Sequence, residues 1–176
     1  AVLDDTENSR FEKLNQETFA KSALILLQFP LNTLSPTGFL LTETYPFSLI
    51  LTPDKKIITV SNYEPPFVKK VLQKEFPENT NLWDILFQLI WELTFGFNEL
   101  LATMKKNVAT LEKKIQVATE NEQLYQIMDI QKSLIYFQEA TVDNQQVLEN
   151  FYKSDLLQLS EKQRGQLHDI LVENRQ

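Results

Sequence analysis

Several residue types on which catalytic sites depend are scarce or missing in this chain. There is no cysteine among the 176 residues, which excludes disulfides, thiolate metal sites and cysteine nucleophiles. The three glycines, Gly38, Gly96 and Gly165, lie too far apart to build a phosphate-binding loop or a dinucleotide fingerprint. With a single histidine, His168, a histidine zinc cluster is impossible, and a Ser-His-Asp or Cys-His mechanism could use only that residue. We therefore expect no enzyme.

Positive charge is also in deficit. The chain has 17 Lys and Arg against 24 Asp and Glu, a net charge of −7 and a pI of about 4.8. Phosphate backbones and anionic membrane surfaces are bound by clustered basic residues, so we expect no nucleic-acid partner and no adhesion to anionic lipid. An acidic surface is compatible with divalent cations, but most acidic proteins are merely soluble. No spacing among the acidic residues singles out a catalytic pair.

No stretch is expected to span a membrane, which needs about 20 largely apolar residues. The nearest is "LWDILFQLIWELTFGF", in which Asp84, Gln88 and Glu92 recur at every fourth position. They form a narrow polar stripe on an otherwise apolar helix, which is typical of a helix buried on most sides by protein. "AVLDDTENSR" is not a signal peptide, and we expect the chain to be a piece of a longer protein.

The first half of the chain reads as a sheet. Residues 1–18 are polar and are expected to hold a helix end and a connection. "FAKSALILLQFPL" predicts a buried strand bounded by Pro30, and "TLSPTG" predicts a turn. "FLLTETYPFSLILT" and "IITVSN" flank a Pro-Asp turn and predict a hairpin, with Pro46 at an irregularity or a strand start. We count three or four strands over residues 19–62.

The second half changes to a helical period. "EPPFVKKVLQKEF" predicts a helix with one apolar face, formed by Phe67, Val68, Val71, Leu72 and Phe76. A long helix should start at a cap formed by Asn81 and Asp84 and continue to about Thr119, interrupted only by Gly96. A second should run from about Glu122 to Tyr152, and the short connection makes the two antiparallel. Ser160 and Gln163 form a capping box for a last helix, which nothing closes before Gln176.

The second long helix carries an apolar seam at heptad spacing, interrupted by two polar residues. Thr141 and Asn144 could be a polar layer that sets the register, or the seam could simply face solvent there. We favour solvent, because the helices are longer than a compact core requires. The seam consists of Ile127, Ile130, Leu134, Phe137, Thr141, Asn144, Leu148 and Phe151.

These elements predict an α/β chain of the α+β type. A small mixed β-sheet with flanking helices would occupy residues 1–80, a long antiparallel helical hairpin residues 81–159, and the start of a stalk helix residues 160–176. Asp4 and Asp5 stand together near the start, while Asp169 and Glu173 lie four apart on one face of the last helix. Carboxylates from two segments can bind a hard divalent cation, although a solvated face explains them as well.

Read in order, the segments resemble the cytosolic part of the CorA family of magnesium and cobalt transporters. "VLDDTENSRFE" resembles the family's acidic helix end, and "FSLILTPDKKIITVSNYEPPFVKKVL" its strand–turn–strand segment leading into a helix. The two long cytosolic helices are matched by "LWDILFQLIWELTFGFNELLATMKKNVATLEKKI" and "MDIQKSLIYFQEATVDNQQVLENF", and the start of the stalk by "QLHDILVENRQ". The family's Gly-Met-Asn motif and its membrane helices are not in the chain, and its first strands would precede residue 1.

The resemblance implies a regulatory role in ion transport. Family members are homopentamers around a pore in the cell membrane, whose domains on the cytoplasmic side sense Mg²⁺ at acidic sites between subunits. It places one carboxylate at Asp5 and its partner at Asp169, with Asp4 and Glu173 as helpers. Mg²⁺ would be the regulatory ion and Co²⁺ a second candidate, although some relatives move Zn²⁺. This piece alone would be largely monomeric, with the membrane reached through C-terminal helices it does not contain.

A second hypothesis comes from a different class of protein. The heptad seam from Ile127 to Phe151 could dock a partner helix, which would make the chain a soluble helical-hairpin interaction module. Such a module would need no membrane segment and would not respond to divalent ions.

Overall fold

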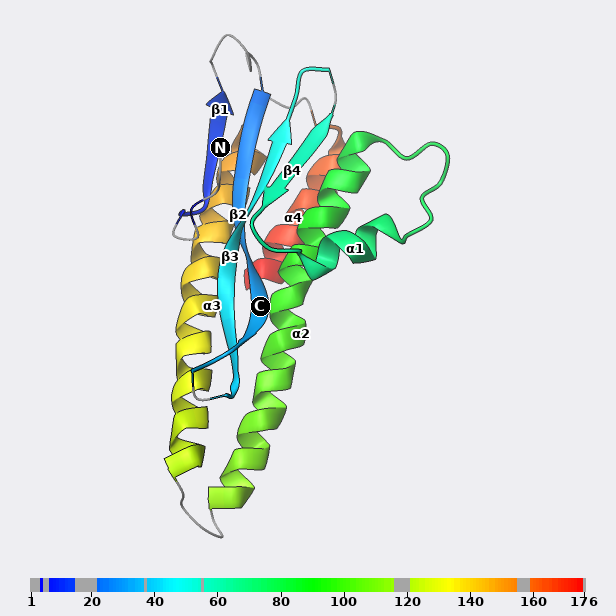
Figure 1. Cartoon of the computed structure of the whole chain (residues 1–176). Coiled ribbons are helices and arrows are strands. Elements are labelled where there is room, and N and C mark those ends of the chain that lie inside the picture. The colour runs from blue at the N-terminus through cyan, green and yellow to red at the C-terminus, as the bar shows by residue number, and fades with distance from the viewer. Residues whose placement is uncertain are drawn as a thin grey trace.

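A four-stranded sheet covers three helices that lie behind it (Figure 1). The computed structural model describes residues 4, 7–14, 22–36, 38–54, 56–115, 121–154 and 159–175. The strands are β1 (Arg10–Leu14), β2 (Ser22–Leu34), β3 (Leu40–Leu51) and β4 (Ile57–Ser61), in that spatial order. The sheet was expected to be mixed, which is wrong: each strand pairs antiparallel with the next strand along the chain.

Strand β1 falls where the sequence predicted a helix end and a connection. Its register places Phe11 opposite Ile25 of β2, and the Phe11 ring meets Phe151 at 5.7 Å between centroids. Arg10, Glu12 and Lys13 give the segment the charged character that edge strands use to discourage further pairing. Because these residues are charged, apolar periodicity did not predict the strand.

Both prolines in the sheet lie where a strand has only one strand beside it. β1 pairs with β2 only as far as Leu26, and β4 pairs with β3 only from Phe47 onward. Pro30 and Pro46 come just beyond these limits, in a two-stranded β2–β3 ribbon with free outer edges, where a missing N–H is tolerated. The strand that was expected to be bounded by Pro30 therefore continues to Leu34.

The predicted turns and caps are confirmed. At the β2–β3 turn the Ser35 N–H donates to the Phe39 carbonyl at 2.8 Å, and Gly38 has a φ of 81°, which favours glycine. The Asn81 and Asp84 side chains each accept a hydrogen bond from the other residue's N–H, at 3.0 and 3.2 Å. Ser160 and Gln163 form the expected capping box.

The helices are α1 (Pro66–Leu72), α2 (Leu82–Ile115), α3 (Asn121–Lys153) and α4 (Glu161–Arg175). α1 is shorter than predicted, and two members of its expected apolar face, Leu72 and Phe76, are exposed. α2 and α3 run antiparallel, but α4 lies between them and the β2–β3 ribbon covers them (Figure 1). They therefore pack mainly on α4 and the sheet rather than on each other.

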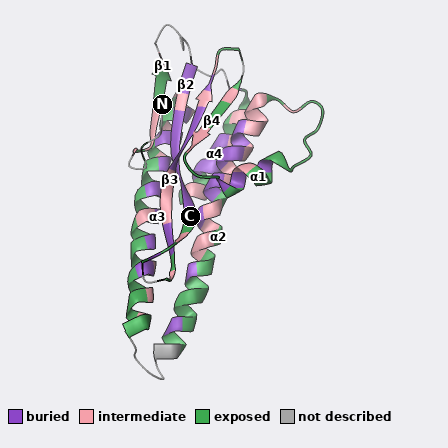
Figure 2. Cartoon of the chain, in the orientation of Figure 1, coloured by how far each residue is buried: buried purple, intermediate pink, exposed green. Residues whose placement is uncertain are grey.

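One hydrophobic core joins the sheet to all four helices, and Figure 2 shows its buried residues gathered at the end of the molecule that contains α4. Alternate residues of β2 face it, Ile25, Leu27 and Phe29, and each is fully buried. They meet Leu86, Ile90 and Leu93 of α2, Leu148 and Phe151 of α3, and Leu167 and Ile170 of α4.

The polar break in the seam of α3 is buried, so the favoured solvent interpretation is wrong for Asn144. Asn144 is 1% exposed; its Oδ1 accepts from the Gln28 N–H and its Nδ2 donates to the Gln28 carbonyl, both at 2.8 Å. Ser133 Oγ likewise accepts from the Thr42 N–H at 2.9 Å. α3 thus uses polar side chains to satisfy the free edges of the β2–β3 ribbon.

Among the residues that the structure describes, one helix is apolar enough to pass as a membrane span by length and composition, contrary to the expectation that none would. It is the span Leu82–Lys113 of α2. Core helices of soluble proteins pass the same test, and α2 packs against α1, α4 and β2. The packing agrees with the interpretation of α2 as a core helix.

Candidate metal centre

Helix α4, which carries Asp169 and Glu173, is held between α2 and α3 by polar contacts in its last turn. Glu173 Oε1 accepts from Asn98 Nδ2 of α2 at 2.7 Å. On the other side Asn174 Nδ2 donates to the Thr141 carbonyl at 2.9 Å, and Arg175 forms an ion pair with Glu149 at 2.7 Å. These contacts set the position of α4, and with it the position of Asp169.

Asp169 lines a small pocket between α4 and the first turns of α2. The pocket has a volume of about 140 Å³, and its other acidic residue is Asp84. Gln88 and Gln166 add amide groups, while Phe87, Trp91 and Ile170 form an apolar wall. Two carboxylates and two amides on packed helices give an oxygen-rich site of the kind that hard divalent cations prefer.

Two of these side chains already make hydrogen bonds. Asp84 Oδ2 accepts the Asn81 N–H, which fixes the carboxylate at the N-terminus of α2, and Gln88 Nε2 donates to Glu92 Oε1 at 3.0 Å. Gln166 differs, because its Oε1 is buried without a hydrogen-bond partner. A buried amide oxygen without a donor is costly. A cation beside Asp84 and Asp169 would supply the missing interaction.

The structure treats the four predicted metal ligands differently. Asp169 lies in the pocket with Asp84, whereas Glu173 lines a different pocket and already accepts from Asn98. Asp4 is exposed and does not line the Asp169 pocket. Asp5 lies outside the described residues. The roles of Asp5, Asp4 and Glu173 as ligands stay predictions.

Sequence reasoning missed Asp84 and Gln166. Asp84 was interpreted only as a capping residue and as part of a polar stripe, and both interpretations are compatible with its place in the pocket. No local pattern connects residue 84 to residue 169, because the pairing depends on how α4 lies on α2. The usable signal was the stripe itself: Asp84 and Gln88 remain polar on a helix whose other sides are buried.

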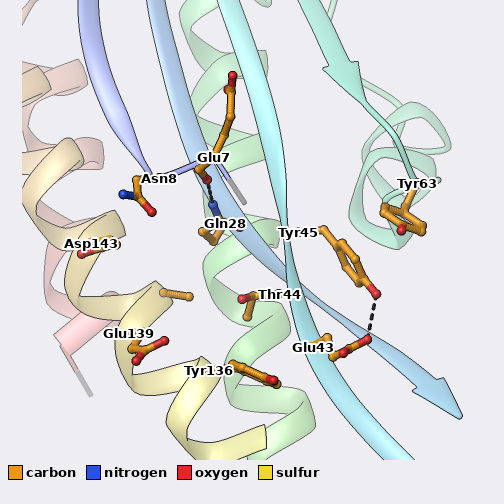
Figure 3. A pocket seen from close by; sticks show the side chains of 11 residues that line it. Glu7, Asn8, Gln28, Glu43, Thr44, Tyr45, Tyr63, Tyr136, Glu139 and Asp143 are labelled. Carbon is orange, nitrogen blue, oxygen red and sulfur yellow. Dashed lines mark hydrogen bonds between the residues drawn. The ribbon is translucent and has the colours of Figure 1, made fainter. Parts of the chain in front are cut away.

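A larger and more acidic cavity lies elsewhere, between α3 and the β2–β3 ribbon (Figure 3). Its volume is about 560 Å³. Figure 3 shows Glu139 and Asp143 of α3 on one side and Glu43 and Tyr45 of β3 on the other. Within the described part of the chain, no three Asp, Glu or His side chains here or elsewhere come close enough to hold one metal ion.

Tyr45 has the most perturbed side chain of this larger cavity. Burial, and then a 2.8 Å hydrogen bond from its hydroxyl to Glu43 Oε2, raise the pKa of Tyr45 well above its ordinary value of 10.0. Thr33 Oγ1 donates to the same Glu43 oxygen at 3.1 Å. Glu43 Oε2 thus accepts from two neighbouring donors, which tie this wall of the cavity together.

Comparison with known proteins decides the family. The family model described as "CorA-like Mg2+ transporter protein" matches residues 1–176. This chain belongs to the CorA-like family. A search of curated proteins finds no match in sequence.

Solved structures share the CorA-like fold at low sequence identity. The soluble domain of CorA from Methanocaldococcus jannaschii superposes with a TM-score of 0.82 at 18% identity, covering 98% of this chain and 67% of that one. The complete CorA magnesium transporter of that organism also matches with a TM-score of 0.82 at 18% identity. That match covers 98% of this chain and 53% of the transporter chain. The cytoplasmic domain of ZntB from Vibrio parahaemolyticus matches at 0.67 and 16% identity, with 98% and 67% covered. This CorA-like chain spans about half of the complete transporter.

Proposed function

We propose that this chain is the ion-sensing regulatory domain of a CorA-like divalent-cation transporter, with Mg²⁺ as the sensed ion and Co²⁺ as a second ion it could carry. The observation that supports the proposal is the pocket in which Asp84 of α2 and Asp169 of α4 lie together, in a chain of this family. The whole protein would be a homopentamer in the cell membrane, with this domain on the cytoplasmic side.

The proposed mechanism is electrostatic. Two carboxylates in one pocket repel each other unless a cation lies between them. The apolar wall of Phe87, Trp91 and Ile170 lowers the local dielectric, which strengthens both the repulsion between the carboxylates and their attraction to a cation. A bound ion would therefore hold α4 against α2. The oxygens that one chain does not supply would come from water or from the partner subunit's Asp5. Because the ion favours one arrangement of the subunits, its loss would shift the population toward another.

The alternative, a helical-hairpin interaction module, retains less support. Leu148 and Phe151 at the end of its proposed docking seam are fully buried inside the domain, and Asn144 is bound to β2. The first part of α3 presents apolar residues to solvent, among them Leu124, Met128 and Ile135, which are about half exposed. This function would gain support if the full protein bound a partner helix there with no dependence on divalent ions.

The proposal is tested by limited proteolysis of the full-length protein in detergent, with and without millimolar Mg²⁺. Wild type should be protected by Mg²⁺, and Asp169→Asn should lose most of this protection. Glu161→Gln is the matched control, because Glu161 is an exposed carboxylate on the same helix. Equal digestion of wild type and Asp169→Asn under both conditions would contradict the site.

A further inference from the structure

A further, mostly apolar cavity lies between α1, α2 and β2, apart from the carboxylate pocket of Asp169. Its volume is about 270 Å³. Three segments contribute to it: the end of β2, the first turn of α1 and the middle of α2. The apolar lining consists of Pro30, Leu31, Pro66, Phe67, Leu93 and Leu100. Clefts of about this size with apolar walls and a few polar groups are typical small-molecule sites.

Gly96 lies in the lining of this cavity, in the middle of the 34-residue helix α2. Glycine inside a helix is about 1 kcal/mol less favourable than alanine. Packing does not require it, because a Cβ placed on Gly96 would meet only Pro30 Cγ, at 3.8 Å, an ordinary contact. Gly96 therefore makes α2 less stable without relieving any clash. Its effect is to leave open the part of the cavity that a side chain would fill.

The polar groups of the lining favour a ligand that donates hydrogen bonds. Lys70, Glu92 and Glu99 are its charged residues, and Lys74, which is outside the lining, neutralises Glu92, so the local charges balance. Lys70 pairs with Glu99 Oε2 at 2.8 Å, and Lys74 pairs with Glu92 Oε1 at 2.7 Å. Among the described contacts these pairs leave Glu99 Oε1 and Glu92 Oε2 able to accept. An ammonium head can donate hydrogen bonds to these two oxygens, whereas a carboxylate head has no hydrogen to donate to them.

We propose that this cavity binds a small organic cation with an apolar body, of the arylalkylammonium class. The ring would lie among Pro30, Phe67 and Leu93, over the bare backbone of Gly96. The ammonium head would reach Glu92 and Glu99. Phe67 already makes edge contacts with Phe29 and Phe47, at 5.7 and 4.9 Å between centroids, so it offers a fixed aromatic surface. This site shares no lining residue with the pocket of Asp84 and Asp169.

Two probes of similar shape and opposite charge test the ligand class. Isothermal titration calorimetry on the whole protein should detect 2-phenylethylamine, with phenylacetate binding at least about tenfold more weakly because its head has no hydrogen to donate to the carboxylates. Glu99→Gln should narrow this difference. Absence of heat from 2-phenylethylamine, or equal affinity for the two probes, would overturn the proposal.

The glycine supplies the structural control. Gly96→Leu fills the cavity and should abolish binding of 2-phenylethylamine, and Gly96→Ala should weaken it. Gly165→Ala is the matched helical replacement outside the cavity, with nothing within 4 Å of the new Cβ, and should bind as wild type does. Both alanine variants should raise Tm by about 2–4 °C, because alanine stabilises a helix relative to glycine, and this measurement checks that the variants are folded. Unchanged binding by folded Gly96→Leu would contradict the assignment.

Discussion

The two halves of α3 have the same apolar periodicity and opposite environments. Leu148, in the half that lies beside α4, is 0% exposed, whereas Ile127, on the same seam near the helix start, is 41% exposed. Figure 2 shows the same contrast as buried residues near α4 and exposed residues toward the far ends of α2 and α3. The heptad spacing describes which residues share a stripe. What decides burial is whether the sheet and α4 lie opposite that stripe.

The contrast is sharpest for two leucines on the same helix. Leu148→Ala should lower the free energy of unfolding by about 2–5 kcal/mol, because it opens a cavity in the core. Leu124→Ala should change it by less than about 0.5 kcal/mol. Urea unfolding of both variants measures the difference. Similar losses would mean that Leu124 is also packed, and that the two halves of α3 do not differ.

Asn144 tests whether the buried half of α3 depends on its polar contact with β2. Asn144→Ala leaves both the N–H and the carbonyl of Gln28 buried without partners and should destabilise the protein by about 2–4 kcal/mol. Asn150→Ala, an exposed asparagine on the same helix, is the control and should be close to neutral. If Asn144→Ala unfolded at the same urea concentration as wild type, the hydrogen bonds from Asn144 to the edge of β2 would contribute nothing to stability.

Removing the cap of α4 should affect only the half of the molecule that α4 fills. Ser160→Ala removes the side-chain acceptor for the Gln163 N–H and should destabilise the protein by about 1 kcal/mol. Hydrogen exchange should become faster at the start of α4. Exchange in the first turns of α3, which α4 does not cover, should stay the same, and a uniform increase across α3 would contradict this separation.

The smallest expected effect concerns pH. Folding raises the pKa of Tyr45 above 10.0, mainly through burial and then through Glu43, so the folded protein keeps a proton that the unfolded chain releases. The stability from this group is complete below pH 10.0 and declines as the pH rises above it. Tyr45→Phe should therefore flatten the loss of stability above pH 10.0, measured by thermal unfolding. A slope equal to that of wild type would show that Tyr45 is not shifted.

Much of the fold could be predicted because local patterns specify it. The turns, the capping residues Asn81 and Ser160, and the two long helices follow from spacing alone. β1 could not be predicted, since its apolar residues are too few to show a period and its partner supplies the pairing. The burial of Asn144 was equally hidden, because it depends on where β1 ends along β2.

The candidate site was predicted only in part for the same reason. Asp169 was found through resemblance to a family, whereas its neighbour Asp84 comes from α2 and becomes a neighbour only when α4 packs on that helix. Gln166 carries no acidic signal, and its orphan oxygen is a property of packing. Contacts between residues 84 and 169 are set by tertiary structure, which no local spacing encodes.

The most direct test of the proposed ion-sensing site is Mn²⁺ binding to the full-length protein, measured as the loss of the free-ion signal in electron paramagnetic resonance. Wild type should bind Mn²⁺ and release it when Mg²⁺ is added. Asp84→Asn and Asp169→Asn should each weaken binding at least about tenfold, while Glu161→Gln should not. If all four proteins bound Mn²⁺ equally, or if none bound it, the pocket between α2 and α4 would not be the sensor.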